Sequence, residues 1–449
     1  MILYIGKNVF GYINRQGDMM EKQKRFTKSE WSWIMYDWAN SAFSILAASV
    51  LSIYATEIAR AEGIADSASD AIWLWAGALS ALVVAIFAPI LGAAADYKGK
   101  RMRMFAGFFA VAILSTGLIS VTNTFVMLVL LYAITNLCFA GANVFYDAFL
   151  VDVTSRDRMD RVSSWGYAMG YIGGSTIPFI ASIALLVLSE YWLGVIPISA
   201  LLAMRLACGI TAIWWAVFTI PFFKHVRQVS YIEPERNIIR KSFARIVKSA
   251  KLMKEEKNLF KFFIAYFCYI NGVGAIIMSA SKLATSLDFD ILYILGGLFI
   301  TQIVACPCSI AYNHLSRKFS NKTMIMVGIC TYVLVSIVGL FMTESWHFLV
   351  LAGLVGTAQG GIQALSRSFF GKLIPDKKRA GEFFGFYNIF GKFESVLGTA
   401  LMAIVRMFTD DVHYAIIPVL VLFIAGGALM LTVPNDKDVP EAEETEVSA

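Results

Sequence analysis

Long runs of apolar residues constrain this chain more than any other feature of its sequence. A helix needs about 20 apolar residues to cross the hydrocarbon core of a bilayer, and it satisfies its backbone hydrogen bonds internally. Such runs recur along the whole chain, so the sequence predicts an all-α polytopic membrane protein with twelve transmembrane helices. The predicted spans are approximately 33–56, 72–95, 104–121, 125–151, 164–188, 202–223, 259–281, 291–313, 323–342, 347–366, 382–405 and 414–433.

Composition excludes the other architectures. Of the 449 residues, 58% are hydrophobic and only 16% are charged, whereas a soluble domain is about half apolar and a quarter charged. A membrane β-barrel would alternate apolar and polar residues over strands of about ten residues. The six cysteines lie inside apolar runs and no histidine cluster accompanies them. This pattern argues against a disulfide framework, a metal site or another cofactor.

The basic residues define an orientation. If both termini are cytoplasmic, the predicted cytoplasmic segments hold 32 of the 38 Lys and Arg residues, and the external segments hold only Arg60 and Arg406. Cytoplasmic loops carry such an excess, so the net charge of +6 needs no nucleic-acid partner. The predicted organisation is an N-terminal cytoplasmic segment (1–31), a six-helix bundle (32–223), a cytoplasmic linker with an amphipathic helix (224–258), a second six-helix bundle (259–433) and an acidic cytoplasmic tail (434–449).

The loop after the second predicted span fits the pattern G-x-x-x-D-x-x-G-[KR]-[KR]. Its first glycine permits close helix contact, its second suits a tight turn, and its aspartate can cap the N-terminus of a neighbouring helix. The two basic residues are expected to face the cytoplasm and lipid phosphate, with Asp152 as a partner for Arg101. The residues of this predicted gating loop are Gly92, Asp96, Gly99, Lys100, Arg101 and Asp152.

In position, length and topology this loop resembles the signature loop of the major facilitator superfamily. The resemblance implies two six-helix bundles that rock about a central site. In the second half, the corresponding loop has Arg317 where the acid should stand and Ser320 where glycine should stand. We therefore expect the two halves to differ at this end.

The first predicted span carries a more specific motif, YDWANS, at residues 36–41. This segment resembles the hallmark of the vacuole amino-acid effluxer (autophagy-related) family and its bacterial members within that superfamily. Segments 163–174, 359–368 and 383–392 support the resemblance, which covers nearly the whole chain. It implies a secondary transporter that exports amino acids or similar small polar solutes, driven by a proton or ion gradient.

Polar residues within the spans are candidates for a transport pathway, because an ionisable group in a membrane needs a partner or water. In the superfamily, spans one, four, seven and ten line the cavity and span eleven flanks it. A structural contact between helices is the alternative interpretation, and for Asn271, Gln359 and Gln363 both stay open. Asp37 and Lys392 favour function, because burying a charge for stability alone is unfavourable. The candidates are Tyr36, Asp37, Asn40, Asn143, Asp147, Asn271, Gln359, Gln363 and Lys392.

Some positions depart from the family pattern or receive a different interpretation. Asn271 stands where relatives tend to have an acid, and Asp147 stands where asparagine is expected. The coupling ion therefore does not follow from the resemblance. Arg367, just beyond the tenth predicted span, is interpreted as a gate or a lipid anchor, and Trp33 as an interfacial anchor.

The sequence thus favours a monomeric transporter in a bacterial inner membrane, with membrane lipid and a small polar solute as its partners. One alternative is a transporter-like receptor that binds a nutrient without moving it, although the linker and tail are short for a signalling domain. A membrane-embedded enzyme or a lipid scramblase is another. The four histidines lie at span ends or in loops, which argues against the enzyme.

Overall fold

The computed structural model describes residues 25–174, 177–190, 192–233, 242, 256–393, 397–409 and 411–435. The predicted amphipathic helix of the linker, most of the N-terminal segment and most of the acidic tail lie outside these ranges.

The described chain is almost entirely helical, and eleven of its helical stretches are long and apolar enough to cross a membrane. The helices and helical turns are α2 (Lys28–Ala48), α3 (Val50–Ala61), α4 (Asp66–Ala95), α5 (Lys100–Ile119), α6 (Phe125–Ala148), α7 (Leu150–Val153), η1 (Arg156–Arg158), α8 (Met159–Met169), η2 (Gly170–Gly174), α9 (Ile177–Leu188), α10 (Ala200–His225), α12 (Lys257–Ser286), α13 (Ile291–Phe319), α14 (Asn321–Gly339), α15 (Ser345–Leu373), η3 (Lys377–Arg379), α16 (Ala380–Phe393), α17 (Leu397–Arg406), η4 (Val412–Ile416) and α18 (Ile417–Leu431).

The predicted all-α membrane fold is confirmed. One predicted span, 382–405, differs because it contains two shorter helices, α16 and α17, with the undescribed residues 394–396 between them. This is why eleven long spans are counted in the described part of the chain where the sequence predicts twelve.

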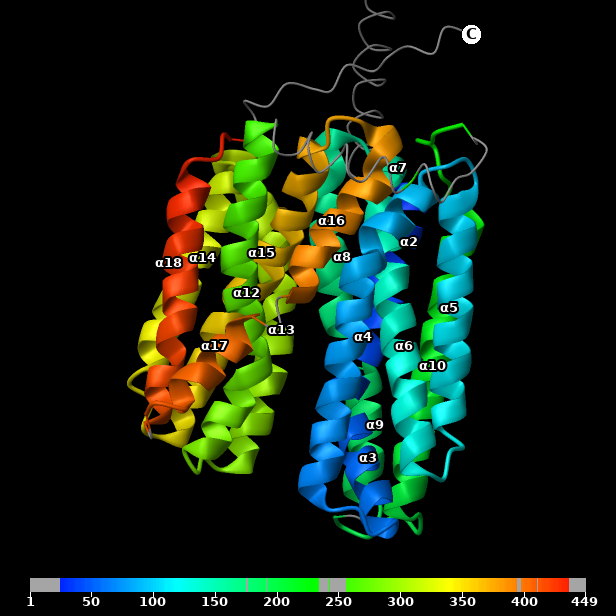
Figure 1. The fold of residues 1–449 in the computed structure, drawn as a ribbon, viewed down its shortest axis with the longest axis vertical. Helices are drawn as coiled ribbons and strands as arrows, with labels where there is room; N and C mark the ends of the chain where they lie inside the picture. Colours follow the sequence, from blue (N-terminus) through cyan, green and yellow to red (C-terminus); the bar gives the residue numbers. More distant parts are fainter. Residues whose placement is uncertain are drawn as a thin grey trace, which may run out of the picture.

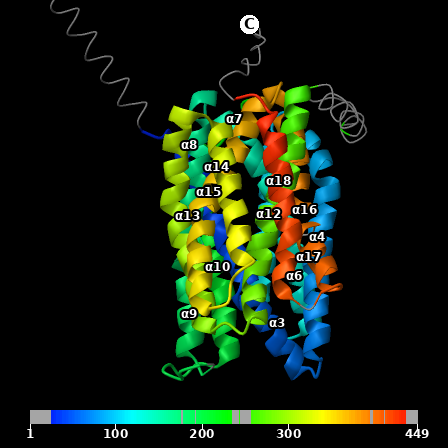
Figure 2. The ribbon, with the colours of Figure 1, turned by 90° about the vertical axis from the view of Figure 1, so that its left-hand side faces the viewer.

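The helices lie in two groups, α2 to α10 and α12 to α18 (Figure 1). The groups are close together at the end that carries α7 and α16, and they diverge toward the end that carries α3 and α9. A view turned by 90° shows the helices running along the long axis of the molecule (Figure 2). We call the end that carries the loop at residues 96–99 the signature-loop end.

Each group has its own aromatic core. In the N-terminal bundle, the ring of Tyr36 contacts Phe105, Tyr146 and Phe222, with centroid distances of 5.1, 4.7 and 5.3 Å. In the C-terminal bundle, Tyr332 stacks on Phe423 at 5.0 Å. Close packing of this kind resists deformation, so each bundle is suited to move as a unit and the interface between them is the place for change.

Helices α4 and α16 bring the two bundles into direct contact. A Cβ atom added to Gly92 would lie 1.9 Å from the carbonyl oxygen of Gly381. Only glycine at this position lets the two backbones approach so closely. The hydrogen bonds between the bundles that are described below also lie in the half of the molecule nearest the signature loop.

Candidate functional site

A polar cavity of about 230 Å³ lies between the two bundles. Helices α2, α6 and α8 form one wall, and α12, α15 and α16 form the other. Two carboxylates and one guanidinium line it among the described side chains, which leaves a formal charge of −1 at neutral pH. The lining residues are Asp37, Asn40, Ser44, Phe139, Asn143, Tyr146, Asp147, Tyr167, Tyr266, Ile270, Gln363, Arg367, Tyr387, Asn388 and Gly391.

Arg367 of α15 closes this cavity on the side of the signature-loop end. Its Nη2 donates to Asp37 Oδ2 at 3.1 Å, and its Nη1 donates to Asp147 Oδ1 at 3.3 Å. Its Nε and Nη2 also donate to Oγ and the carbonyl oxygen of Ser163, at 3.0 and 3.2 Å. The Arg367 side chain is only 4% exposed, whereas those of Asp37 and Asp147 remain 14% and 12% exposed. Since excluding water strengthens attraction between opposite charges, these contacts hold the bundles together at this end.

Three aromatic rings surround the Arg367 guanidinium. Its carbon lies 4.4 Å from the ring centroid of Tyr167, 4.6 Å from that of Trp33 and 5.5 Å from that of Tyr146. Trp33 is fully buried and stacks on Tyr146 at 4.4 Å, and its Nε1 donates to the carbonyl oxygen of Tyr146 at 2.9 Å. The interpretations of Trp33 as an interfacial anchor and of Arg367 as a lipid anchor are therefore wrong.

Amide and phenol groups complete the polar lining. Asn40 Nδ2 donates to Asn143 Oδ1 at 2.9 Å within the N-terminal bundle. Across the interface, Asn388 Nδ2 donates to Asp147 Oδ2 at 3.1 Å. Of the candidate residues, Asp37, Asn40, Asn143, Asp147 and Gln363 meet at this one cavity.

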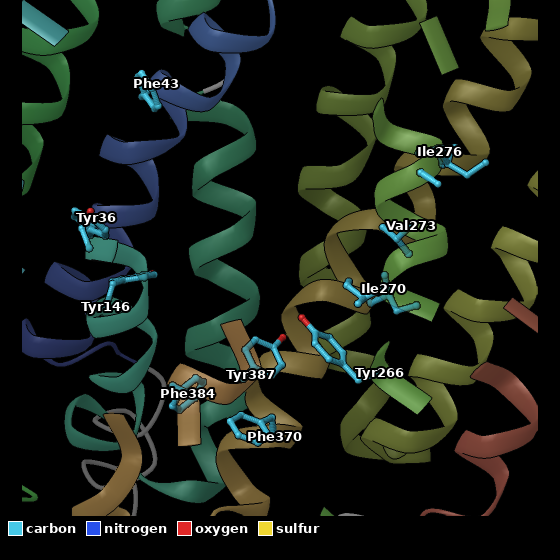
Figure 3. Packing of buried hydrophobic residues seen from close by; sticks show 14 of the residues in the cluster. Tyr36, Phe43, Tyr146, Tyr266, Ile270, Val273, Ile276, Phe370, Phe384 and Tyr387 are labelled. Atoms are coloured by element: carbon cyan, nitrogen blue, oxygen red, sulfur yellow. The ribbon is translucent and has the colours of Figure 1, made fainter. Parts of the chain in front are cut away.

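The C-terminal wall also contains two tyrosines that the sequence analysis did not single out. Tyr266 and Tyr387 stack with a centroid distance of 4.5 Å, and their rings lie next to each other in the close-up view (Figure 3). Within the described part of the chain, no group of His, Cys, Asp and Glu is placed to hold a metal ion. The site is therefore made of carboxylate, guanidinium, amide and aromatic groups.

Three candidates lie away from this cavity. Tyr36 is fully buried in the aromatic core of the N-terminal bundle. Asn271 Nδ2 donates to the carbonyl oxygen of Phe267 within α12, and Asn271 does not line the cavity. Gln359 lines a separate, smaller cavity inside the C-terminal bundle. A fourth candidate, Lys392, has a side chain outside the described part of the structure.

The predicted gating loop forms a buried cluster at the bundle interface. Asp96 accepts hydrogen bonds from the backbone N–H groups of Gly381 at 2.7 Å and Glu382 at 3.0 Å, at the first turn of α16. Arg101 donates to Asp96 at 2.8 Å and to Asp152 at 2.5 Å. The expected helix cap and the expected ion pair are both present. Arg101 is fully buried, however, so the expectation that it faces the cytoplasm is wrong.

The two remaining loop residues occupy different environments. Gly99 has a φ of +68°, the left-handed conformation that a tight turn requires of glycine. Lys100 is half-buried at the start of α5.

The first residues of the linker complete this cluster. The sequence analysis missed their contribution. The Ser230 N–H donates to Asp152 Oδ1 at 2.8 Å, and Gln228 Nε2 donates to the carbonyl oxygen of Ala95 at 3.1 Å. The Ile232 N–H donates to the carbonyl oxygen of Asp96 at 2.8 Å. The chain leaving the N-terminal bundle therefore folds back over the gating loop.

The corresponding loop of the second half uses a different contact. Asp160, at the start of α8, accepts from Asn321 Nδ2 and from Lys372 Nζ, each at 2.6 Å. An acid of the N-terminal bundle thus bridges the interface here, and Arg317 stands where the superfamily pattern has its acid. Ser320 has a φ of +100°, a conformation that favours glycine, at the position where that pattern has glycine.

These observations define the class of protein. Two helical bundles enclose a polar cavity, and bonds between them close it at one end, which is the architecture of an alternating-access transporter. The solved structure of the MFS (major facilitator superfamily) proton:xylose symporter XylE has the same fold, with a TM-score of 0.68. That match covers 91% of this chain and 96% of the symporter at 11% sequence identity, so it concerns the fold alone. The chain therefore has the MFS fold.

Sequence comparison then gives the family. The model of the "Vacuole effluxer Atg22 like" family matches residues 26–156 and 151–443, and the chain belongs to this family. It is 43% identical to "Uncharacterized MFS-type transporter YxiO" of Bacillus subtilis (strain 168), over 94% of this chain and 98% of that protein. It is 23% identical to "Autophagy-related protein 22-1" of Penicillium rubens, over 63% of this chain and 50% of that protein. The resemblance stated from the motifs is confirmed, and the chain is an MFS-type membrane transporter and not an enzyme.

Proposed function

We propose that this transporter exports amino acids or similar small polar solutes across a bacterial plasma membrane, with the signature-loop end in the cytoplasm. The cytoplasmic side is then closed, and the cavity faces outward. The observation that carries the proposal is the contact of Arg367 with both Asp37 and Asp147 across the two bundles. This contact must break before the cavity can open to the cytoplasm.

Breaking it exposes complementary charges to a substrate. When Arg367 withdraws, Asp37 and Asp147 lose their shared cation, so both carboxylates become available to an ammonium group. Arg367 in turn becomes free to bind a carboxylate. A zwitterion can therefore replace the internal ion pairs, and its differential binding supplies the energy that shifts the conformational equilibrium.

Uptake by proteoliposomes tests this proposal. A panel of labelled amino acids would be offered with and without an imposed pH gradient, to wild type, Asp37→Asn and a matched control, Asp157→Asn, whose side chain is exposed at the same end. We expect gradient-dependent accumulation in wild type and control and its loss in Asp37→Asn protein that remains folded. Saturable binding without flux under any gradient would favour a receptor and overturn the transporter assignment. Absence of both binding and flux would eliminate amino acids as the substrate.

A further inference from the structure

The groups that hold the Arg367 guanidinium form a site that belongs to one bundle alone. Asp37 comes from α2, Asp147 from α6, and Ser163 and Tyr167 from α8, while the ring of Trp33 in α2 lies 4.6 Å from the guanidinium carbon. We call these five residues the guanidinium cage. Because all five lie in the N-terminal bundle and Arg367 lies in the C-terminal bundle, the cage survives intact when the bundles part.

The cage matches a guanidinium better than an ammonium. Its acceptors receive hydrogen bonds from Nε, Nη1 and Nη2 of Arg367, which is the planar, forked donor pattern that a guanidinium presents and an ammonium does not. Rings at 4.4 and 4.6 Å from the guanidinium carbon favour a delocalised cation that can stack on them. Without Arg367, the cage carries two carboxylates and no described cation.

Close packing keeps the cage in this shape. A Cβ atom on Gly166 would lie 2.5 Å from Asp37 Oδ2 and 3.1 Å from Arg367 Nη2. The absence of a side chain at Gly166 therefore creates the space in which the carboxylate and the guanidinium meet. The stacking of Trp33 on Tyr146 fixes the indole beside them.

We propose that the guanidinium cage is the binding site for a guanidinium-bearing solute, and that Arg367 occupies it only while the cytoplasmic end is closed. This inference rests on the proposed export function and specifies its substrate class. In the inward-open state the withdrawn Arg367 leaves the cage to the solute. On closing, Arg367 and the solute compete for the same acceptors, so the return of Arg367 expels the solute into the outward-facing cavity.

Transport by the wild-type full chain provides the first test. Arginine and citrulline have nearly the same shape, but citrulline carries a neutral urea group in place of the guanidinium. In proteoliposomes we expect arginine to inhibit uptake of labelled leucine at a concentration about tenfold or more below the concentration of citrulline that inhibits equally. Lysine should inhibit less strongly than arginine. If labelled leucine is transported and arginine inhibits no better than citrulline, the guanidinium assignment is refuted while the export proposal survives. If no amino acid is transported, the export proposal fails, and the binding test below then decides whether the cage binds a guanidinium.

Binding to a variant with an empty cage is the second test. Arg367→Ala removes the internal occupant, and methylguanidinium at non-denaturing concentration should then raise the melting temperature, whereas methylammonium should not. Lys372→Ala is the matched control, because it removes another cross-bundle cation, paired with Asp160 at 2.6 Å, without emptying an aromatic cage. The methylguanidinium effect should be absent in this control and in Arg367→Ala/Asp37→Asn. Equal responses to both cations would overturn the proposal, and Arg367→Gln replaces Arg367→Ala if the latter does not fold.

Discussion

Replacing Asp96 by asparagine should shift the conformational equilibrium toward a structure that is open at the signature-loop end. Asp96 Oδ1 accepts from the N–H of Gly381 and from Arg101, and Oδ2 accepts from the N–H of Glu382. In Asp96→Asn the amide oxygen can keep the first two contacts, but the NH₂ group would meet the Glu382 N–H as donor against donor. The contact with Arg101 lies within one bundle and is present in both conformations. Its weakening therefore largely cancels in the free-energy difference between the closed and the open state.

The magnitude follows from the groups that are lost. One hydrogen bond to a charged acceptor contributes about 1.5–3 kcal/mol, and a negative charge at a helix N-terminus contributes about 0.3–1 kcal/mol. Both exist only while α4 and α16 are in contact. Their sum of about 2–4 kcal/mol corresponds to a shift of about 30-fold to about 1,000-fold in favour of the open state.

Cysteine accessibility measures this shift. Ser164 is fully buried, its carbonyl oxygen accepts from Ser309 of the other bundle at 2.9 Å, and its hydroxyl makes no hydrogen bond. Ser164→Cys should therefore be protected from a membrane-impermeant maleimide applied at the signature-loop end, and should become reactive when combined with Asp96→Asn. The same proteins without Ser164→Cys give the background from native cysteines, and Asp157→Asn is the control substitution. An unchanged labelling rate in folded Asp96→Asn protein would refute the reasoning.

Three further substitutions test other parts of the interface. Gly92→Ala places a Cβ 1.9 Å from the Gly381 carbonyl oxygen and should also expose Ser164→Cys, whereas Gly107→Ala, with no atom within 4 Å, should stabilise α5 by up to about 1 kcal/mol. Ser320→Gly should raise the melting temperature, because it relieves a φ of +100° that costs about 1–3 kcal/mol. The loss of the serine helix cap costs only a few tenths of a kcal/mol. A lower melting temperature would show that the backbone at Ser320 is not strained. Asp160→Asn and Lys372→Met should each raise the labelling rate and be non-additive in combination, since they remove one ion pair; additive effects would show that the pair is not coupled.

The fold was predictable because the bilayer restricts the backbone to helices, so the length of apolar runs determines the number of spans. The ends of the spans were less predictable. The tenth span was expected to end at residue 366, yet α15 continues to Leu373 and carries Arg367 inside it. A charged residue normally marks a span end, and the burial of Arg367 becomes favourable here through acids, Ser163 and aromatic rings of the other bundle.

The residue types of the site were predictable from the sequence, but the direction in which each side chain points was not. Adjacent residues on a helix point about 100° apart, since 3.6 residues complete a turn. Asp37 therefore faces the cavity while Tyr36 faces the aromatic core, and Ile270 faces the cavity while Asn271 does not. The rotation of each helix is set by packing against helices that are distant in sequence, and Asp37 and Arg367 are separated by 330 positions.

At four hydrogen bonds between the bundles, the N-terminal bundle supplies an acidic acceptor and the C-terminal bundle supplies the donor. This arrangement predicts how pH acts on the transporter. Asp37, Asp96, Asp147 and Asp160 of the N-terminal bundle all accept from donors of the C-terminal bundle. Neutralising these acids weakens the hydrogen bonds that they accept and removes their attraction for Arg367 and Lys372, so it weakens the contact between the bundles at the signature-loop end. Asp96 is fully buried, whereas Asp37 and Asp147 line the polar cavity and are accessible from it.

In the proposed orientation, acidification of the external face should therefore open the cytoplasmic end, and neutral pH should keep it closed. A proton that enters from outside thus drives the same transition that lets cytoplasmic solute reach the cavity, which is the logic of proton-coupled export. Labelling of Ser164→Cys from the cytoplasmic side should rise as external pH falls, and Asp37→Asn/Asp147→Asn protein should label rapidly at every pH. The reasoning is contradicted if the labelling rate of Ser164→Cys does not change with external pH while transport still depends on the pH gradient. In that case the coupling proton binds elsewhere, and the ion pairs of Arg367 only hold the two bundles together.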